Sequence, residues 1–178
     1  MSLKKSINKY KTSNVSESID TIHNIRNKID RIDNKIHDLI IQRAEIVEQV
    51  VREKKKENNH SLVIYRPARE HEILVRLLKR HRGNLSEKSL INIWRNLISS
   101  YIEMQGELTL SYCGNLDKIV NNHFGVGIKK QKTKTALEAL KSVNENKSQI
   151  TVLPFPNKNN DWWVKFSNFE RINVIGSI

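Results

Sequence analysis

Apolar residues recur at every third or fourth position through the first third of the chain. The series consists of Ile22, Ile25, Ile29, Ile32, Ile36, Leu39, Ile46 and Val50. This heptad-like spacing is typical of a long helix that packs against another helix along one narrow stripe. No Pro or Gly interrupts the segment from Val15 to about Glu57, which as a helix would be roughly 60 Å long. The remaining helices of one chain cannot cover such a length, so the pattern predicts a homodimer with two long helices packed together.

Two shorter helices are predicted next. Pro67 suits a first helical position, and Gly83 is the expected C-cap of the second helix. Ser86 is the expected N-cap of the third helix, and Gln105 falls on the apolar face of that helix. The apolar residues of the second helix are Ile73, Leu74, Leu77 and Leu78, and those of the third are Leu90, Trp94, Leu97, Ile98, Tyr101 and Leu108.

The pattern changes from Gly114 onward. Short apolar runs, "ITVLPF" and "INVIG", are separated by polar loops and by one expected helix around "TALEALKSV". We therefore predict a mainly α-helical protein in three parts. These are a basic flexible tail (1–14), a helical domain (15–112) and a small α/β C-terminal segment of unknown role (113–178). The chain ends in the strand-like run "VIGSI", so we expect that it lacks a further part.

Composition and charge narrow the possible functions. The chain has 178 residues and is 38% hydrophobic, and its net charge of +12 favours anionic partners. The basic runs "KKSINKYK" and "KKQKTK" are typical of solvated tails and loops, and no known nucleic-acid motif accompanies them. No apolar run reaches membrane-spanning length, and no secretory signal is present. The lone Cys113 excludes an internal disulfide and a cysteine zinc site, and it favours a cytoplasmic location.

Strong hydrogen-bonding side chains interrupt the apolar faces of all three helices. Arg43 occupies the stripe position between Leu39 and Ile46. Further polar residues on or beside these faces are Arg26, Asp33, Lys54, Arg69, Glu70 and Gln105. Any one of them could be a snorkelling side chain or a member of a buried ion pair. Because four of the seven are cations and burying unpaired charge is costly, together they predict an anionic ligand inside the bundle.

These residues carry a resemblance to a known family. The stretches "IRNKIDRIDNKIHDLIIQRAEIVEQVVREKK", "YRPAREHEIL" and "IWRNLISSYIEMQ" resemble the all-helical chorismate mutases over about residues 16–110. The resemblance rests on the ordered spacing of the polar residues. Asp33 follows Arg26 by seven positions, Arg43 follows Asp33 by ten, and Lys54 follows Arg43 by eleven. The resemblance implies a three-helix chorismate mutase type II fold in an intertwined homodimer. It also implies rearrangement of chorismate to prephenate in the biosynthesis of phenylalanine and tyrosine.

The resemblance assigns four residues to substrate binding. Arg26 is expected to reach the site from the partner subunit, whereas Arg43 and Arg69 hold the substrate from the same chain. Asp33 is expected to orient an arginine. Arginine suits these positions because its guanidinium binds carboxylates bidentately and stays charged when buried.

Three further residues are assigned to the chemistry. The resemblance implies that Lys54 and Gln105 donate hydrogen bonds to the ether oxygen of the breaking bond, and that Glu70 binds the substrate hydroxyl. The rearrangement takes place within one molecule, so it needs no nucleophile, cofactor or metal. Arg66 and Tyr101 depart from the pattern of many relatives, which leaves their effect on the site open.

Other functions remain possible on the same pattern. Isochorismate-pyruvate lyase activity occurs on a related helical fold, although the pair Arg69–Glu70 favours the mutase. A non-catalytic helical dimerisation module and a nucleic-acid-binding module are alternatives from another class. The C-terminal stretches "LSYCGNLDKIVNNHFG" and "ITVLPFP" resemble part of a prephenate dehydratase-like domain. The Thr-Arg-Phe stretch that dehydratases use is absent, so we expect no dehydratase activity.

Overall fold

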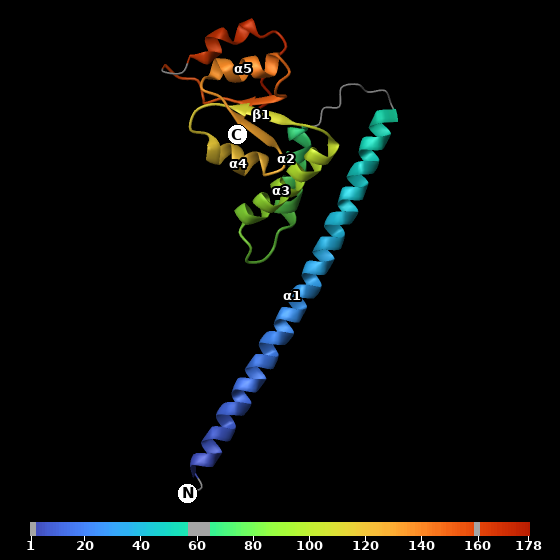
Figure 1. Cartoon of the computed structure of the whole chain (residues 1–178), viewed down its shortest axis with the longest axis vertical. Coiled ribbons are helices and arrows are strands. Elements are labelled where there is room, and N and C mark those ends of the chain that lie inside the picture. Colours follow the sequence, from blue (N-terminus) through green and yellow to red (C-terminus); the bar gives the residue numbers. More distant parts are fainter. Residues whose placement is uncertain (1–2, 57–64, 159–160) are drawn as a thin grey trace. The chain divides into compact units, whose positions relative to one another are not determined.

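The computed structural model describes residues 3–56, 65–158 and 161–178, but not the side chains of residues 3–20, 54 and 55. The described chain is mainly helical and has a small three-stranded sheet near its C-terminus, which confirms the predicted fold class (Figure 1). It divides into two compact units, Met1–Val47 and Glu48–Ile178. The predicted domain boundary near residue 112 stays a prediction. Among the described residues, no helix is long and apolar enough to cross a membrane.

The first helix, α1, extends from Leu3 to Lys56 (Figure 1). It therefore begins well before the predicted start at Val15 and includes most of the segment expected to be a flexible tail. The physical reason is that this segment contains neither Pro nor Gly, the two residues that most disfavour a helix. The apolar stripe of α1 is uncovered in the single chain. Its eight residues, from Ile22 to Val50, are each 46–63% exposed.

Two helices follow in the second unit, α2 (Pro67–Arg80) and α3 (Glu87–Gln105). Both predicted starts are confirmed, and Ser86 Oγ accepts a hydrogen bond from the Ser89 amide at 3.1 Å. The predicted C-cap Gly83 is wrong, because α2 already ends at Arg80, with His81 in an extended conformation as its cap. Leu108 also lies outside α3, which ends before Gly106 (φ +152°).

The C-terminal segment forms the predicted α/β structure. Its parallel strands, β1 (Thr109–Tyr112), β2 (Lys129–Lys132) and β3 (Ile150–Val152), lie in the order β2-β1-β3. Helices α4 (Asp117–Phe124) and α5 (Ala136–Asn144) cover opposite faces of this sheet (Figure 1). The run "INVIG" was expected to be strand-like, but it pairs with none of the described strands, and a 3₁₀ helix, Trp162–Asn168, precedes it. An apolar run becomes a strand only where a sheet edge accepts its backbone hydrogen bonds.

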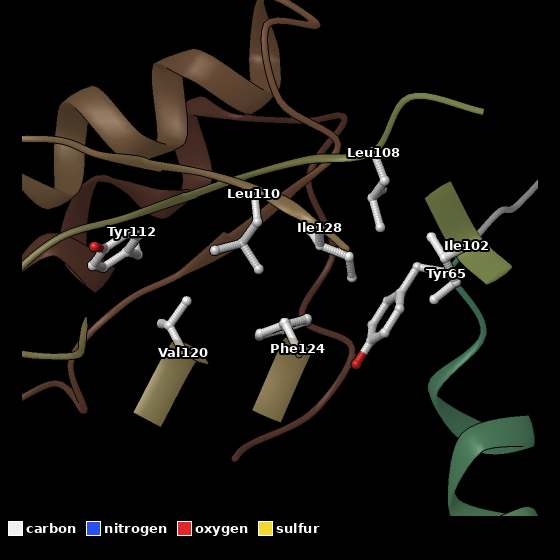
Figure 2. Close-up of a cluster of buried hydrophobic side chains, with 8 residues drawn as sticks. All are labelled: Tyr65, Ile102, Leu108, Leu110, Tyr112, Val120, Phe124 and Ile128. Atoms are coloured by element: carbon white, nitrogen blue, oxygen red, sulfur yellow. The ribbon is translucent and has the colours of Figure 1, made fainter. Parts of the chain in front are cut away.

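One apolar core joins the helical part of the second unit to the sheet (Figure 2). The core comes from the segment before α2, from α3, from β1 and its approach, from α4 and from the approach to β2. Its residues are Tyr65, Ile102, Leu108, Leu110, Tyr112, Val120, Phe124 and Ile128. Because Tyr65 and Ile102 share this core with the sheet, the C-terminal segment and helices α2 and α3 form one packed body.

Replacement of a core valine tests this packing. Val120 is fully buried on α4, so Val120→Ala removes two buried methyl groups and leaves a cavity. We expect the free energy of unfolding to fall by about 2 kcal/mol. Chemical denaturation followed by circular dichroism would measure it, with Val174→Ala as the matched control at a 74% exposed position. Equal stability of the two variants would contradict the described core.

Candidate active site

The first unit holds three of the predicted site residues on α1. Arg26 and Asp33 are exposed, whereas Arg43 is half-buried although it lies on the apolar stripe. Lys54 falls within α1 but belongs to the second unit, and its side chain lies outside the described residues. Arg26, Asp33 and Arg43 are therefore placed on one helix.

The other predicted residues lie on α2 and α3. Arg69 is exposed, and its Nη1 donates to Glu72 Oε2 at 2.9 Å. Gln105 is half-buried, and its Nε2 donates to the carbonyl oxygen of Tyr101 at 3.1 Å. Both donors thus contact neighbours on their own helices. An exposed ion pair such as Arg69–Glu72 contributes little to stability, about 0–1 kcal/mol, so it is easily exchanged for another anion.

Glu70 is the predicted residue that the structure places in a distinctive environment. Its side chain is only 10% exposed, and its Oε1 lies 3.4 Å from Nε of Arg95 on α3. Burial raises the pKa of Glu70 above its usual value, while the charge of the neighbouring Arg95 lowers it. Arg95 therefore favours the ionised carboxylate, the form that accepts a hydrogen bond from a substrate hydroxyl.

Two more titratable groups complete this cluster. The hydroxyl of Tyr65 lies 3.4 Å from Nε2 of His123 on α4. Burial, and then the charge of Glu70, raises the pKa of Tyr65 to about 12. Burial, and then the charge of Arg95, lowers the pKa of His123 to about 4. At neutral pH the phenol is thus protonated and the imidazole neutral, which leaves Arg95 as the cation that balances Glu70 in this cluster.

Sequence reasoning missed Arg95, Tyr65 and His123. Arg95 shares one face of α3 with the buried residues Ser99 and Ile102, at the helical spacing i, i+4, i+7, and this is the signal that could have found it. The contact between Tyr65 and His123 has no comparable signal, because 58 residues separate the two in the chain.

The structure brings some predicted residues together with unpredicted ones. It pairs Glu70 with Arg95, but it pairs Arg69 with Glu72 and Gln105 with Tyr101. Among the described residues, no group of three or more His, Cys, Asp or Glu side chains could hold a metal ion. Within the second unit, the cluster around Glu70 offers a carboxylate acceptor, Arg69 on α2 offers a charged donor and Gln105 on α3 offers an amide donor.

Comparison with known proteins now identifies the region that holds these residues. Residues 25–106 match the family chorismate mutase type II, and this stretch contains all seven predicted site residues. The matched stretch ends just after α3 and before β1. The predicted resemblance to the all-helical chorismate mutases is therefore confirmed over this stretch.

Curated relatives show the same similarity. The chain is 30% identical over 97 residues to a bifunctional chorismate mutase/prephenate dehydratase of Stutzerimonas stutzeri, covering 53% of this chain and 27% of that protein. A protein of the same name from Aquifex aeolicus is 29% identical over 100 residues, covering 54% of this chain and 27% of its own length. The chain thus spans about a quarter of the length of these relatives. No solved structure matches the chain at comparable significance.

One relative matches a longer stretch. The bifunctional chorismate mutase/prephenate dehydratase of Neisseria gonorrhoeae is 26% identical over 136 residues, which is 74% of this chain and 36% of that protein. Because 136 residues exceed the stretch 25–106, this similarity includes residues outside the chorismate mutase type II match.

Removal of the cation beside Glu70 tests the electrostatics of the cluster. In Arg95→Gln a largely buried carboxylate loses its charged partner, so we expect the free energy of unfolding at pH 7 to fall by roughly 2–3 kcal/mol. Arg95 lowers the pKa of both Glu70 and His123, so its loss raises both values in the folded state. The folded variant then binds protons more readily than wild type, and its deficit should shrink as the pH falls from 7 toward 5.

Urea denaturation of wild type and variant at several pH values would measure this deficit. The control is Arg76→Gln, which changes an exposed arginine on α2 and should show little deficit at any pH. A deficit of Arg95→Gln that stays constant across this pH range would mean that Arg95 acts through packing rather than through its charge.

Proposed function

We propose that this protein is a chorismate mutase that rearranges chorismate to prephenate. The observation that carries the proposal is the ordered set of seven polar residues on helical apolar faces, all within the stretch that matches chorismate mutase type II. Chorismate is a flexible dianion. The enzyme must therefore hold it folded, with the two reacting carbons close together, which is an orientation effect.

Arginines hold the substrate carboxylates. Arg43 and Arg69 bind from the same chain, and Arg26 reaches the site from the partner subunit. The position of Arg43 on the apolar stripe supports this role, because a carboxylate beside it is stabilised in surroundings of low polarity. Asp33 orients one of these arginines. Arg69 exchanges its exposed contact with Glu72 for the substrate at little cost.

Fixed donors stabilise the charge that grows on the ether oxygen as its bond breaks. Lys54 and Gln105 supply them, and Gln105 exchanges its bond to the Tyr101 carbonyl for one to the substrate. Glu70 accepts a hydrogen bond from the substrate hydroxyl; burial raises the pKa of this carboxyl, and Arg95 opposes that rise and so favours the ionised form. Such donors accelerate a reaction most where water is excluded and where they need no rearrangement.

The exposed apolar stripe of α1 supports a homodimer. Its eight Ile, Leu and Val residues are about half exposed in the single chain, and their heptad-like spacing suits a second copy of the same helix. We propose that α1 of each subunit packs against its partner and donates Arg26 to the partner's site. A dimer with twofold symmetry then holds two equivalent sites.

We further propose that this chain has no prephenate dehydratase activity. The relatives are named for both activities, but the Thr-Arg-Phe stretch is absent from this sequence. The described C-terminal segment is a three-stranded sheet with two short helices. We therefore expect this chain to release prephenate without converting it further.

Incubation with chorismate tests the activity and the site together. We expect loss of the diene absorbance and formation of prephenate, without phenylpyruvate. Arg43→Ala should lower the rate by on the order of 10² to 10³, because it removes one charged donor. The control is Arg52→Ala. Arg52 lies nine residues after Arg43 on α1, which places it about 180° around the helix. Its side chain is exposed and pairs with Glu48.

Each other outcome has a distinct meaning. Near-wild-type turnover by Arg43→Ala would overturn the site assignment. A folded protein that leaves chorismate unchanged would overturn the proposed function, and release of pyruvate from isochorismate would assign it to the lyases instead.

Mixed dimers test whether Arg26 acts across the interface. Arg26→Ala and Arg43→Ala should each be nearly inactive alone. When the two chains are co-expressed, half of the dimers are mixed, and each mixed dimer has one of its two sites intact. We expect about a quarter of wild-type activity in the mixture. If both arginines served the same chain's site, the mixture would stay as inactive as the single variants.

A further inference from the structure

The loop from Gly125 to Gly127 packs directly on the side of α3. The amide of Val126 donates to Asn96 Oδ1 at 3.2 Å, and the amide of Gly127 donates to Ser99 Oγ at 3.2 Å. Two successive amides of the C-terminal segment thus bind side chains on adjacent turns of a helix that belongs to the chorismate mutase type II match.

The contact leaves no space for side chains on the two glycines. A Cβ at Gly125 would collide with Ser99 Oγ, and the φ of +64° at this residue also favours glycine. A Cβ at Gly127 would lie 2.6 Å from the Ser99 carbonyl oxygen, which belongs to the helix backbone and not to a flexible side chain. On the other side, Lys130 Nζ donates to the carbonyl oxygens of Gly125 and Ile128 and so fixes the loop.

The turn of α3 that receives this loop also carries Arg95. The carbonyl oxygen of Arg95 lies against Gly125, so that a Cβ there would approach it to 3.0 Å. The guanidinium of the same residue pairs with Glu70. The loop therefore packs on the same residue that balances the Glu70 carboxylate.

Helix α4 holds the other side of the same cluster. The Tyr65 ring packs against Phe124 with centroids 5.5 Å apart, and its hydroxyl contacts His123. Tyr65 comes shortly before Pro67, the first residue of α2, and Glu70 lies in the first turn of that helix. The C-terminal segment therefore contacts both elements that position Glu70, which are α3 and the entry to α2.

We propose that the C-terminal segment is a positioning element of the mutase site, and that Arg95 is the positioning residue through which its Gly125–Gly127 loop fixes Glu70. This inference rests on the proposed function, in which Glu70 binds the substrate hydroxyl. A domain that was merely tethered would leave the site unchanged when its contact with α3 is disturbed. Disturbing the contact of a positioning element with α3 would instead change the Glu70 pKa and the rate.

The decisive variant is Gly127→Ala, which forces the loop away from α3. With Arg95 displaced, we expect the pKa of Glu70 to rise, because Arg95 lowers it in the wild type. Carbon-13 NMR titration of labelled glutamate carboxylates would measure this value, with Glu70→Gln to assign the signal. We also expect kcat/KM for chorismate to fall roughly 10- to 100-fold. In the pH profile of kcat/KM, the decline on the acid side should begin at a higher pH than in the wild type.

Matched variants separate positioning from loss of structure. Gly176→Ala adds the same methyl group at a glycine with open space around it, and it should leave the titration and the rate unchanged. Asn96→Ala removes only the side chain that accepts a hydrogen bond from the Val126 amide. It should change the Glu70 pKa and the rate in the same direction as Gly127→Ala but by less, and it replaces Gly127→Ala in the test if that variant does not fold. Arg95→Lys keeps the cation and should shift the acid limb less than Arg95→Gln.

The two measurements fail independently. If the folded wild type does not convert chorismate, the proposed function is wrong, but the titration still reports whether the loop controls Glu70. If the wild type is active and Gly127→Ala, or Asn96→Ala in its place, matches Gly176→Ala in both measurements, the positioning role is wrong.

Discussion

The arrangement of the candidate site in the second unit depends on the pairing of Glu70 with Arg95. A carboxylate with nine-tenths of its surface removed from water is costly unless a cation lies beside it. Arg95 supplies that charge from α3, so the mutual placement of α2 and α3 is tied to one electrostatic contact. The loop Gly125–Gly127 and helix α4 then support the two helices at this point. The C-terminal segment therefore contacts both helices close to this ion pair.

The outline of the helices could be predicted from sequence because local signals determine it. The apolar period of α1, Pro67 at the start of α2 and the Ser86 cap of α3 each act within a few residues. Helix ends were less predictable, since Gly83 offered a plausible cap that α2 does not reach. The charge of Arg43 on an apolar stripe was equally visible, because it breaks a regular local pattern.

The remainder of the candidate site could not be predicted because its contacts join distant parts of the chain. Glu70 and Arg95 lie on different helices, and Tyr65 contacts His123 across 58 residues. The packing of the C-terminal segment on α3 depends on two glycines that do not form a recognisable motif. The need for glycine at these two positions is visible only in the structure, where Ser99 occupies the space that a side chain would fill.

The exposed stripe of α1 and the buried contacts of the second unit differ in what completes their packing. On α1, apolar side chains at heptad-like spacing remain about half exposed in one chain, so completion of their packing requires another surface. Around Glu70, by contrast, the chain supplies its own cation, aromatic packing and supporting loop. In the proposed mutase, the first arrangement brings Arg26 from a second subunit and the second fixes the acceptor of the substrate hydroxyl. In this proposal the C-terminal segment serves catalysis without reactive groups of its own, because positioning requires only packing and hydrogen bonds.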